Sequence, residues 1–117
     1  MTVKECYEAF SGNYEDAYSR LRSDERLSRF LIKAASDESF KLLTESLQAH
    51  NLPEAFRAVH TIKGICLNLS ITKLATSSQN LTEALRGREE YGDDIIPLYE
   101  EVKKDYENFI SCVKNLQ

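Results

Sequence analysis

Apolar side chains recur at intervals of three and four residues along most of the chain, the spacing that places them on one face of an α-helix. Short polar breaks separate these periods, and no long linker divides them. The pattern predicts short helices over about 3–10 and 14–22, and two further helices that begin near residues 24 and 37. Longer helices follow over about 52–69, 72–86 and 94–116.

The helix over 52–69 carries the clearest start signal. Asn51, followed three residues later by Glu54, matches a capping box, and Pro53 falls in the first turn, where its missing N–H costs nothing. At 100° per residue, one face of this helix is apolar. It forms the predicted core stripe, which consists of Leu52, Ala55, Val59, Ile62, Cys66 and Leu69.

Composition supports an all-α fold. The 117 residues include only four Gly and two Pro, too few turn residues for a sandwich or barrel of many short strands. We therefore expect a single domain over 1–117 that forms an antiparallel four-helix bundle (up-down-up-down) with short additional N-terminal helices. About 1–35 would form an N-terminal lid of helices, and about 36–117 the bundle.

Charge and cysteine content restrict the function further. A net charge of −4 without a basic run argues against a nucleic-acid partner, because phosphate contacts need clustered Lys and Arg. The three cysteines show no CxxC spacing, which favours a reduced, cytoplasmic protein. No apolar run is long enough to cross a membrane, so we expect no membrane role. We also expect a monomer.

The two histidines lie in different settings. His50 ends a polar helix just before Asn51, where it is expected to be a surface or capping residue. His60 lies in the middle of the 52–69 helix but off its core stripe, so the imidazole should reach solvent. It shares this face with Arg57, Thr61, Lys63, Gly64 and Asn68.

The face around His60 combines three unusual features. Gly64 costs about 1 kcal/mol within a helix, and a missing side chain there leaves room for another protein beside the imidazole. Lys63 places an ammonium where it can stabilise an anion on the imidazole. Phe56 and Leu67 flank the histidine with apolar surface suited to docking. The pattern predicts a nucleophilic imidazole that receives an anionic group from a protein.

The residues alone leave simpler interpretations open. Surface histidines and lysines are common on helices, and a glycine within a helix often serves only close helix packing. A metal site has less support, because no second His, Cys or carboxylate follows His60 by three or four residues. A Ser-His-Asp enzyme is equally unsupported, since nothing resembles a nucleophile elbow. We expect no metal ligands in this chain.

The string Val-His-Thr-Ile-Lys-Gly-Ile-Cys-Leu-Asn-Leu-Ser-Ile at 59–71 resembles the signature of histidine-containing phosphotransfer (HPt) domains of phosphorelays. The family pattern is roughly Ala/Val-His-x-Leu/Ile-Lys-Gly, then small or apolar residues and Asn-Leu-Gly-Leu, with a later leucine that Leu74 supplies. The resemblance implies that His60 accepts the phosphoryl group, Lys63 stabilises it and Gly64 provides clearance for the partner.

Further positions extend this comparison. In several family members a polar side chain twenty-two residues after the histidine orients the imidazole, and a basic residue lies four further on; here they are Thr82 and Arg86. Thr82 departs from the usual Gln or Glu, and Ser70 departs from Gly, which tolerates a left-handed helix end better. The candidates for partner docking or imidazole orientation are Phe56, Arg57, Leu67, Asn68, Thr82 and Arg86.

The resemblance implies a phosphorelay intermediate that is not an enzyme and has no kinase or ATPase activity. Its partners would be response-regulator receiver domains and a hybrid sensor histidine kinase. It would need no cofactor of its own, because Mg²⁺ would be held by the receiver. Two alternatives stay open: the phosphoacceptor domain of a chemotaxis-type histidine kinase, and a helical adaptor that binds receiver domains without phosphoryl transfer.

Overall fold

The computed structural model describes residues 1–116, in which seven α-helices and no strand are formed. They are α1 (Val3–Ala9), α2 (Tyr14–Leu21), α3 (Asp24–Ala35), α4 (Ser39–Gln48), α5 (Leu52–Leu69), α6 (Thr72–Leu85) and α7 (Ile95–Lys114). The all-α prediction is confirmed. Within the described part of the chain, no helix combines the length and apolar content needed to cross a membrane.

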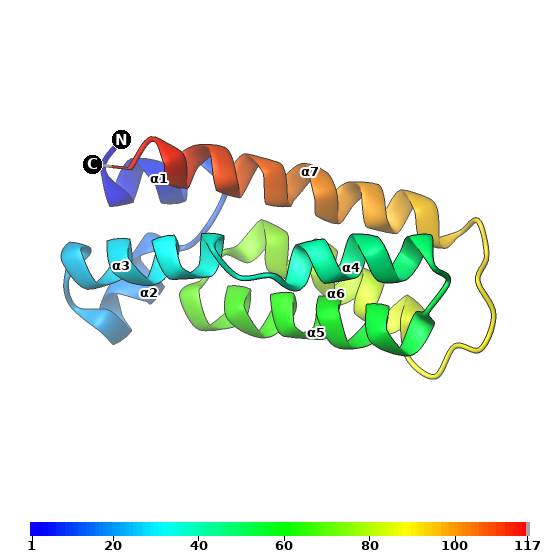
Figure 1. Cartoon of the computed structure of the whole chain (residues 1–117). Coiled ribbons are helices and arrows are strands. Elements are labelled where there is room, and N and C mark those ends of the chain that lie inside the picture. Colours follow the sequence, from blue (N-terminus) through cyan, green and yellow to red (C-terminus); the bar gives the residue numbers. More distant parts are fainter. Residues whose placement is uncertain (117) are drawn as a thin grey trace.

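Helices α4 to α7 form an antiparallel bundle, and each runs opposite to the one before it (Figure 1). α5 packs on α4 and α6, and α6 packs on α7. Large side chains join α4 to α7: the Phe40 and Tyr106 rings stack with their centroids 4.2 Å apart. The Thr44 and Tyr99 hydroxyls, 2.7 Å apart, share a hydrogen bond. The predicted up-down-up-down bundle is thereby confirmed.

Helix α3 continues the line of α4, so these two shorter helices together occupy one edge of the bundle (Figure 1). Leu27 and Leu31 of α3 are fully buried, and α3 packs on both α5 and α7. The N-terminal helices therefore share one hydrophobic core with the bundle. The division into a lid at about 1–35 and a bundle at about 36–117 stays a prediction.

The N-terminal helices also hold the turn between α5 and α6. Ser70 adopts the left-handed conformation, with φ 56°, which is costly for a residue that has a side chain. Its hydroxyl donates to Asp16 Oδ2 at 2.5 Å and accepts from Arg20 Nη2 at 2.7 Å. The Tyr7 hydroxyl donates to the Leu69 carbonyl at 2.7 Å. α1 and α2 thus fix the C-terminal end of α5.

The other end of α5 begins where the sequence predicts. The Asn51 side chain accepts a hydrogen bond from the Glu54 N–H at 3.3 Å. The second half of the predicted capping box is absent, because the Glu54 carboxylate pairs with Arg57 instead. The whole predicted core stripe of α5 is buried. α5 is therefore held at both ends with its opposite face towards solvent.

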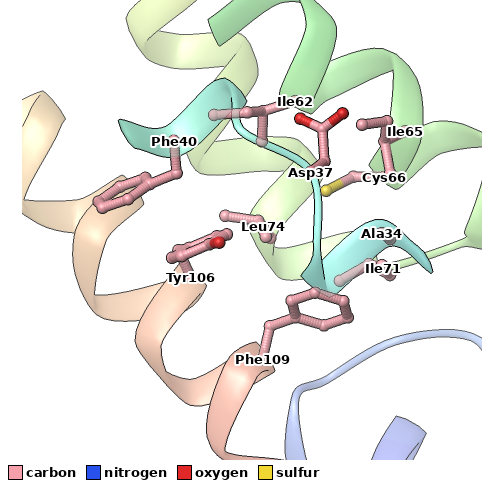
Figure 2. A pocket seen from close by; sticks show the side chains of 10 residues that line it. All are labelled: Ala34, Asp37, Phe40, Ile62, Ile65, Cys66, Ile71, Leu74, Tyr106 and Phe109. Atoms are coloured by element: carbon pink, nitrogen blue, oxygen red, sulfur yellow. The ribbon is translucent and has the colours of Figure 1, made fainter. Parts of the chain in front are cut away.

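A small cavity lies on the buried side of α5, beside the link between α3 and α4 (Figure 2). Its volume is about 20 Å³, and its lining is apolar except for the Asp37 carboxylate and the Tyr106 hydroxyl. Ile62 and Cys66 reach it from α5. Because the space admits about one water molecule, it offers no ligand site.

Candidate functional site

His60 lies on the exposed face of α5, as the helical period predicts. Arg57, Gly64 and Asn68 are exposed on the same helix, and the side chain of Leu67 is 62% exposed. An isolated leucine on a surface is ordinary, but here it lies two turns from a solvent-facing imidazole. The imidazole of His60 is therefore open to a reacting group that approaches from solvent.

The Phe56 ring lies beside the imidazole, and Arg86, which directly follows α6, lies over that ring. The rings of His60 and Phe56 stack with centroids 5.7 Å apart and planes 29° apart. The Arg86 guanidinium carbon lies 5.2 Å from the Phe56 ring centroid. Such a cation–π contact contributes about 0.5–1 kcal/mol at an exposed site. Phe56 therefore lies between His60 and a cation at the C-terminal end of α6.

A polar cluster on α6 lies near Lys63. The Glu83 carboxylate accepts hydrogen bonds from Arg86 Nη2 and Gln79 Nε2, both at 3.1 Å. The Arg86 hydrogen bond, followed by smaller effects of Gln79 and of the Lys63 charge, lowers the pKa of Glu83 below its usual value. The Glu83 carboxylate thus stays ionised at neutral pH and pairs with the positive charge of Arg86.

Sequence reasoning missed Gln79 and Glu83. Their spacing of four residues, with Arg86 three residues further on, is the usual sign of a hydrogen-bonded row on one helix face. Nothing in that spacing places the row beside α5, because the contact depends on how α5 and α6 pack.

Gly64 has open space where a side chain would stand. A Cβ built there would have no atom within 4 Å, apart from its own helix backbone and chain neighbours. At Gly12, by contrast, a Cβ would lie 2.8 Å from the Ser70 carbonyl oxygen. Close packing therefore explains Gly12 but not Gly64. The proposed use of Gly64 as clearance for another molecule fits this open space.

Thr82 does not reach the His60 face. It is fully buried, and its hydroxyl donates to the Ser78 carbonyl at 2.7 Å. A fully buried threonine cannot contact a partner, which corrects the expectation of a docking role. Its hydroxyl bonds to the Ser78 carbonyl within α6, so the hydrogen bond gives no support to the orienting role. Arg86, four residues later, is exposed and does approach the site through Phe56.

The groups that surround His60 are suited to holding an anion. An exposed imidazole can act as a nucleophile, and the ammonium of Lys63, three residues later on the same helix, can stabilise negative charge on it. The Arg86 guanidinium is paired with Glu83. Among residues 1–116, no group of three or more His, Cys, Asp and Glu is placed to hold a metal ion. The expectation that Mg²⁺ is held by a partner stays a prediction.

Comparison with known proteins supports one kind of domain. The family model described as the Hpt domain matches residues 29–111, which reach from within α3 into the last turns of α7 and include every candidate site residue. Neither the curated proteins nor the solved structures gave a match.

Proposed function

Because the chain belongs to the Hpt domain family, whose members are histidine phosphotransfer intermediates of phosphorelays, we propose that His60 carries the phosphoryl group here. The observation that carries this proposal is the exposed imidazole with Lys63 three residues away and open space over Gly64. An anionic group on an exposed helix face needs a cation close by and a free approach, and the position of Lys63 and the open space over Gly64 support both.

The proposed transfer begins on a receiver domain that holds an aspartyl phosphate. A neutral imidazole nitrogen of His60 attacks phosphorus, a P–N bond forms, and the P–O bond to the aspartate breaks with its electron pair on the carboxylate. The second step reverses these bonds towards an aspartate of another receiver. No nucleotide takes part, so we expect no kinase or ATPase activity from this chain.

Each neighbour of His60 has a distinct proposed role. Lys63 stabilises the phosphoryl oxygens, and Gly64 leaves room for the partner's aspartate pocket. Phe56 supports the imidazole through the ring stack described above. Leu67 and Asn68, with Arg57 and Arg86, would contact the partner's surface. Mg²⁺, which neutralises the transferring group, would be supplied by the receiver.

We propose receiver domains and a hybrid sensor histidine kinase as the partners. A phosphoacceptor domain of a chemotaxis-type kinase would use the same His60 face, whereas a pure adaptor would bind receivers without becoming phosphorylated. Retention of both His60 and Lys63 favours transfer over the adaptor, because a scaffold has no need of a nucleophile.

Intact-mass analysis tests this proposal. The chain is mixed with a panel of phosphorylated receiver domains, and we expect one phosphoryl adduct that is acid-labile, base-stable and absent from His60→Ala. The variant His50→Ala serves as the matched control and should still be modified. A folded chain that acquires no adduct from any receiver, or an adduct that survives in His60→Ala, would contradict the role of His60.

A further inference from the structure

Positive charge is concentrated in one short segment of this acidic chain. Between residues 20 and 33 lie five basic and two acidic side chains, a net charge of +3 in a chain whose total is −4. The remaining surface is correspondingly acidic. The segment covers the end of α2 and most of α3, and it contains none of the candidate residues of the His60 site.

Three of these cations form a row on α3, which we call the α3 basic stripe: Arg26, Arg29 and Lys33. All three are exposed, on the face opposite the buried Leu27 and Leu31. The ion pairs found among residues 1–116 involve other cations. The Arg26 guanidinium also donates a hydrogen bond to the Leu21 carbonyl at 3.4 Å. The three exposed charges of the stripe are therefore not paired with carboxylates, although Asp37 lines the same groove as Lys33.

An apolar groove borders this stripe. Phe30, 44% exposed, lines it from α3, and Ile65, Leu69 and the polar Asn68 line it from α5. Asn68 also lies on the His60 face, so the groove borders that face. The volume of this α3–α5 groove is about 230 Å³, enough for one leucine-sized side chain. Lys33 lies at its edge, so one cation of the stripe belongs to the groove itself.

We propose that the stripe and the groove together dock an acidic segment of a partner protein that carries one apolar anchor residue. The anchor would fill the groove on Phe30, and the carboxylates would lie along Arg26 and Arg29. Asp37 lines the groove at the end nearer α4, and its carboxylate would repel the carboxylates of the docked segment. This repulsion sets the direction in which the segment lies along α3. The acidic part therefore runs towards the start of α3.

A protein segment fits this surface better than a membrane does. The binding surface is concave at the groove, and the apolar side of α3 is already buried in the core, so α3 cannot insert its apolar face into a bilayer. Three cations also fall short of the clusters of about 4–8 that bind anionic lipid surfaces. Charge complementarity would speed association with an acidic segment and would weaken with added salt.

The test uses the full ¹⁵N-labelled chain and a short synthetic peptide of Glu and Asp with one central Leu. We expect amide shifts to cluster at Phe30, Lys33 and Ile65, and affinity to fall at least tenfold in Arg29→Glu/Lys33→Glu. Lys104→Glu/Lys114→Glu on α7 gives the same charge change at exposed positions and should bind normally. Replacing the peptide's Leu by Ser should weaken binding at the groove.

The proposal would be overturned by an absence of peptide binding, by equal binding of the peptide to both double variants, or by stronger binding to phosphatidylserine vesicles that is lost in Arg29→Glu/Lys33→Glu. Self-association that disappears in the α3 variant would assign the surface to a second copy and overturn it as well. Phosphoramidate, which phosphorylates imidazoles directly without a receiver, should modify His60 equally in every variant. Failure of docking is thus distinguishable from failure of phosphotransfer.

Discussion

Gly64 and Gly12 show how one residue type serves two different physical needs. A side chain at Gly12 would collide with the Ser70 carbonyl, whereas a side chain at Gly64 would meet nothing. Gly64 therefore carries a helix cost of about 1 kcal/mol that no contact within the chain offsets. A benefit in function, the approach of a partner to His60, accounts for it.

Replacing Gly64 tests this clearance. Gly64→Gln should leave the free energy of unfolding unchanged or raise it by up to about 1 kcal/mol, because glutamine is a better helix former, and yet lower phosphotransfer to His60 at least tenfold. Thermal melting followed by circular dichroism and transfer kinetics give the two readouts. Gly64→Ala, which adds one methyl group, should gain the stability and keep most of the transfer. Normal transfer by Gly64→Gln would contradict the clearance role.

Lys63 is predicted to act on the phosphoryl group and not on the fold. Lys63→Ala should slow phosphorylation of His60 or shorten the lifetime of phosphohistidine, because the nearest ammonium on α5 is lost. Stability should change by less than about 0.5 kcal/mol, as for most surface substitutions. Lys63→Arg keeps the charge and is the matched control. An unchanged rate and an unchanged lifetime would leave Lys63 as a surface charge only.

At the level of elements, the turn between α5 and α6 depends on Ser70, a residue type that local preference disfavours in the left-handed conformation found there. Ser70 replaces the family's glycine in a left-handed position, and its hydroxyl joins α5 to Asp16 and Arg20 of α2. The hydrogen bonds offset the conformational cost. A local preference is thus overridden by a contact between helices that are far apart in the sequence.

Substitutions at Ser70 should separate these two effects. Ser70→Gly removes the left-handed cost together with the hydrogen bonds, whereas Ser70→Ala keeps the cost and loses the bonds. We therefore expect Ser70→Ala to be the less stable variant by about 1 kcal/mol, measured by urea unfolding. Equal stability of the two variants, or a more stable Ser70→Ala, would contradict this account.

The same turn should respond to pH. The Ser70 hydrogen bond, followed by that of Arg20, lowers the pKa of Asp16 below its usual value. A carboxyl whose pKa is lowered by folding stabilises the protein above its unfolded pKa, and this contribution disappears as the pH falls through the folded pKa. In Ser70→Ala the pKa of Asp16, followed by NMR titration, should rise towards the usual value. An unchanged pKa would show that Ser70 does not hold the carboxylate.

At the scale of the whole molecule, the single core shields all three thiols. Cys6, Cys66 and Cys112 are free and buried, and burial raises the pKa of Cys66 to about 12. Burial also raises the pKa of Cys6 and Cys112. The reactive thiolate is therefore scarce at neutral pH, and reagents reach the sulfur only when the structure opens.

Labelling with iodoacetamide measures that opening. At neutral pH the native chain should stay unmodified during the time in which all three cysteines of the urea-unfolded chain are alkylated. Intact-mass analysis counts the adducts. Modification should accelerate in Ser70→Ala, because the population of the opened state rises exponentially as the free energy of unfolding falls. Rapid modification of one cysteine in the native chain would contradict the shared core.

Much of this protein follows from local sequence pattern. The helical period and the Asn51 cap placed α5, its buried stripe and the exposed position of His60, because these properties depend on residues within one or two turns. The family signature lies on the same helix, so the proposed phosphoryl site was also accessible from the sequence. Its chemical role stays a prediction.

Contacts between separate helices were decided only by the tertiary structure. Three observations depend on how different helices pack together. Thr82 is buried, the Glu83 cluster lies beside Lys63, and Asp16 of α2 bonds to Ser70. Periodicity shows which face of a helix is buried but not which neighbour covers it. The open space over Gly64 and the groove beside Phe30 are likewise properties of packing, because only the assembled helices determine where surface stays uncovered.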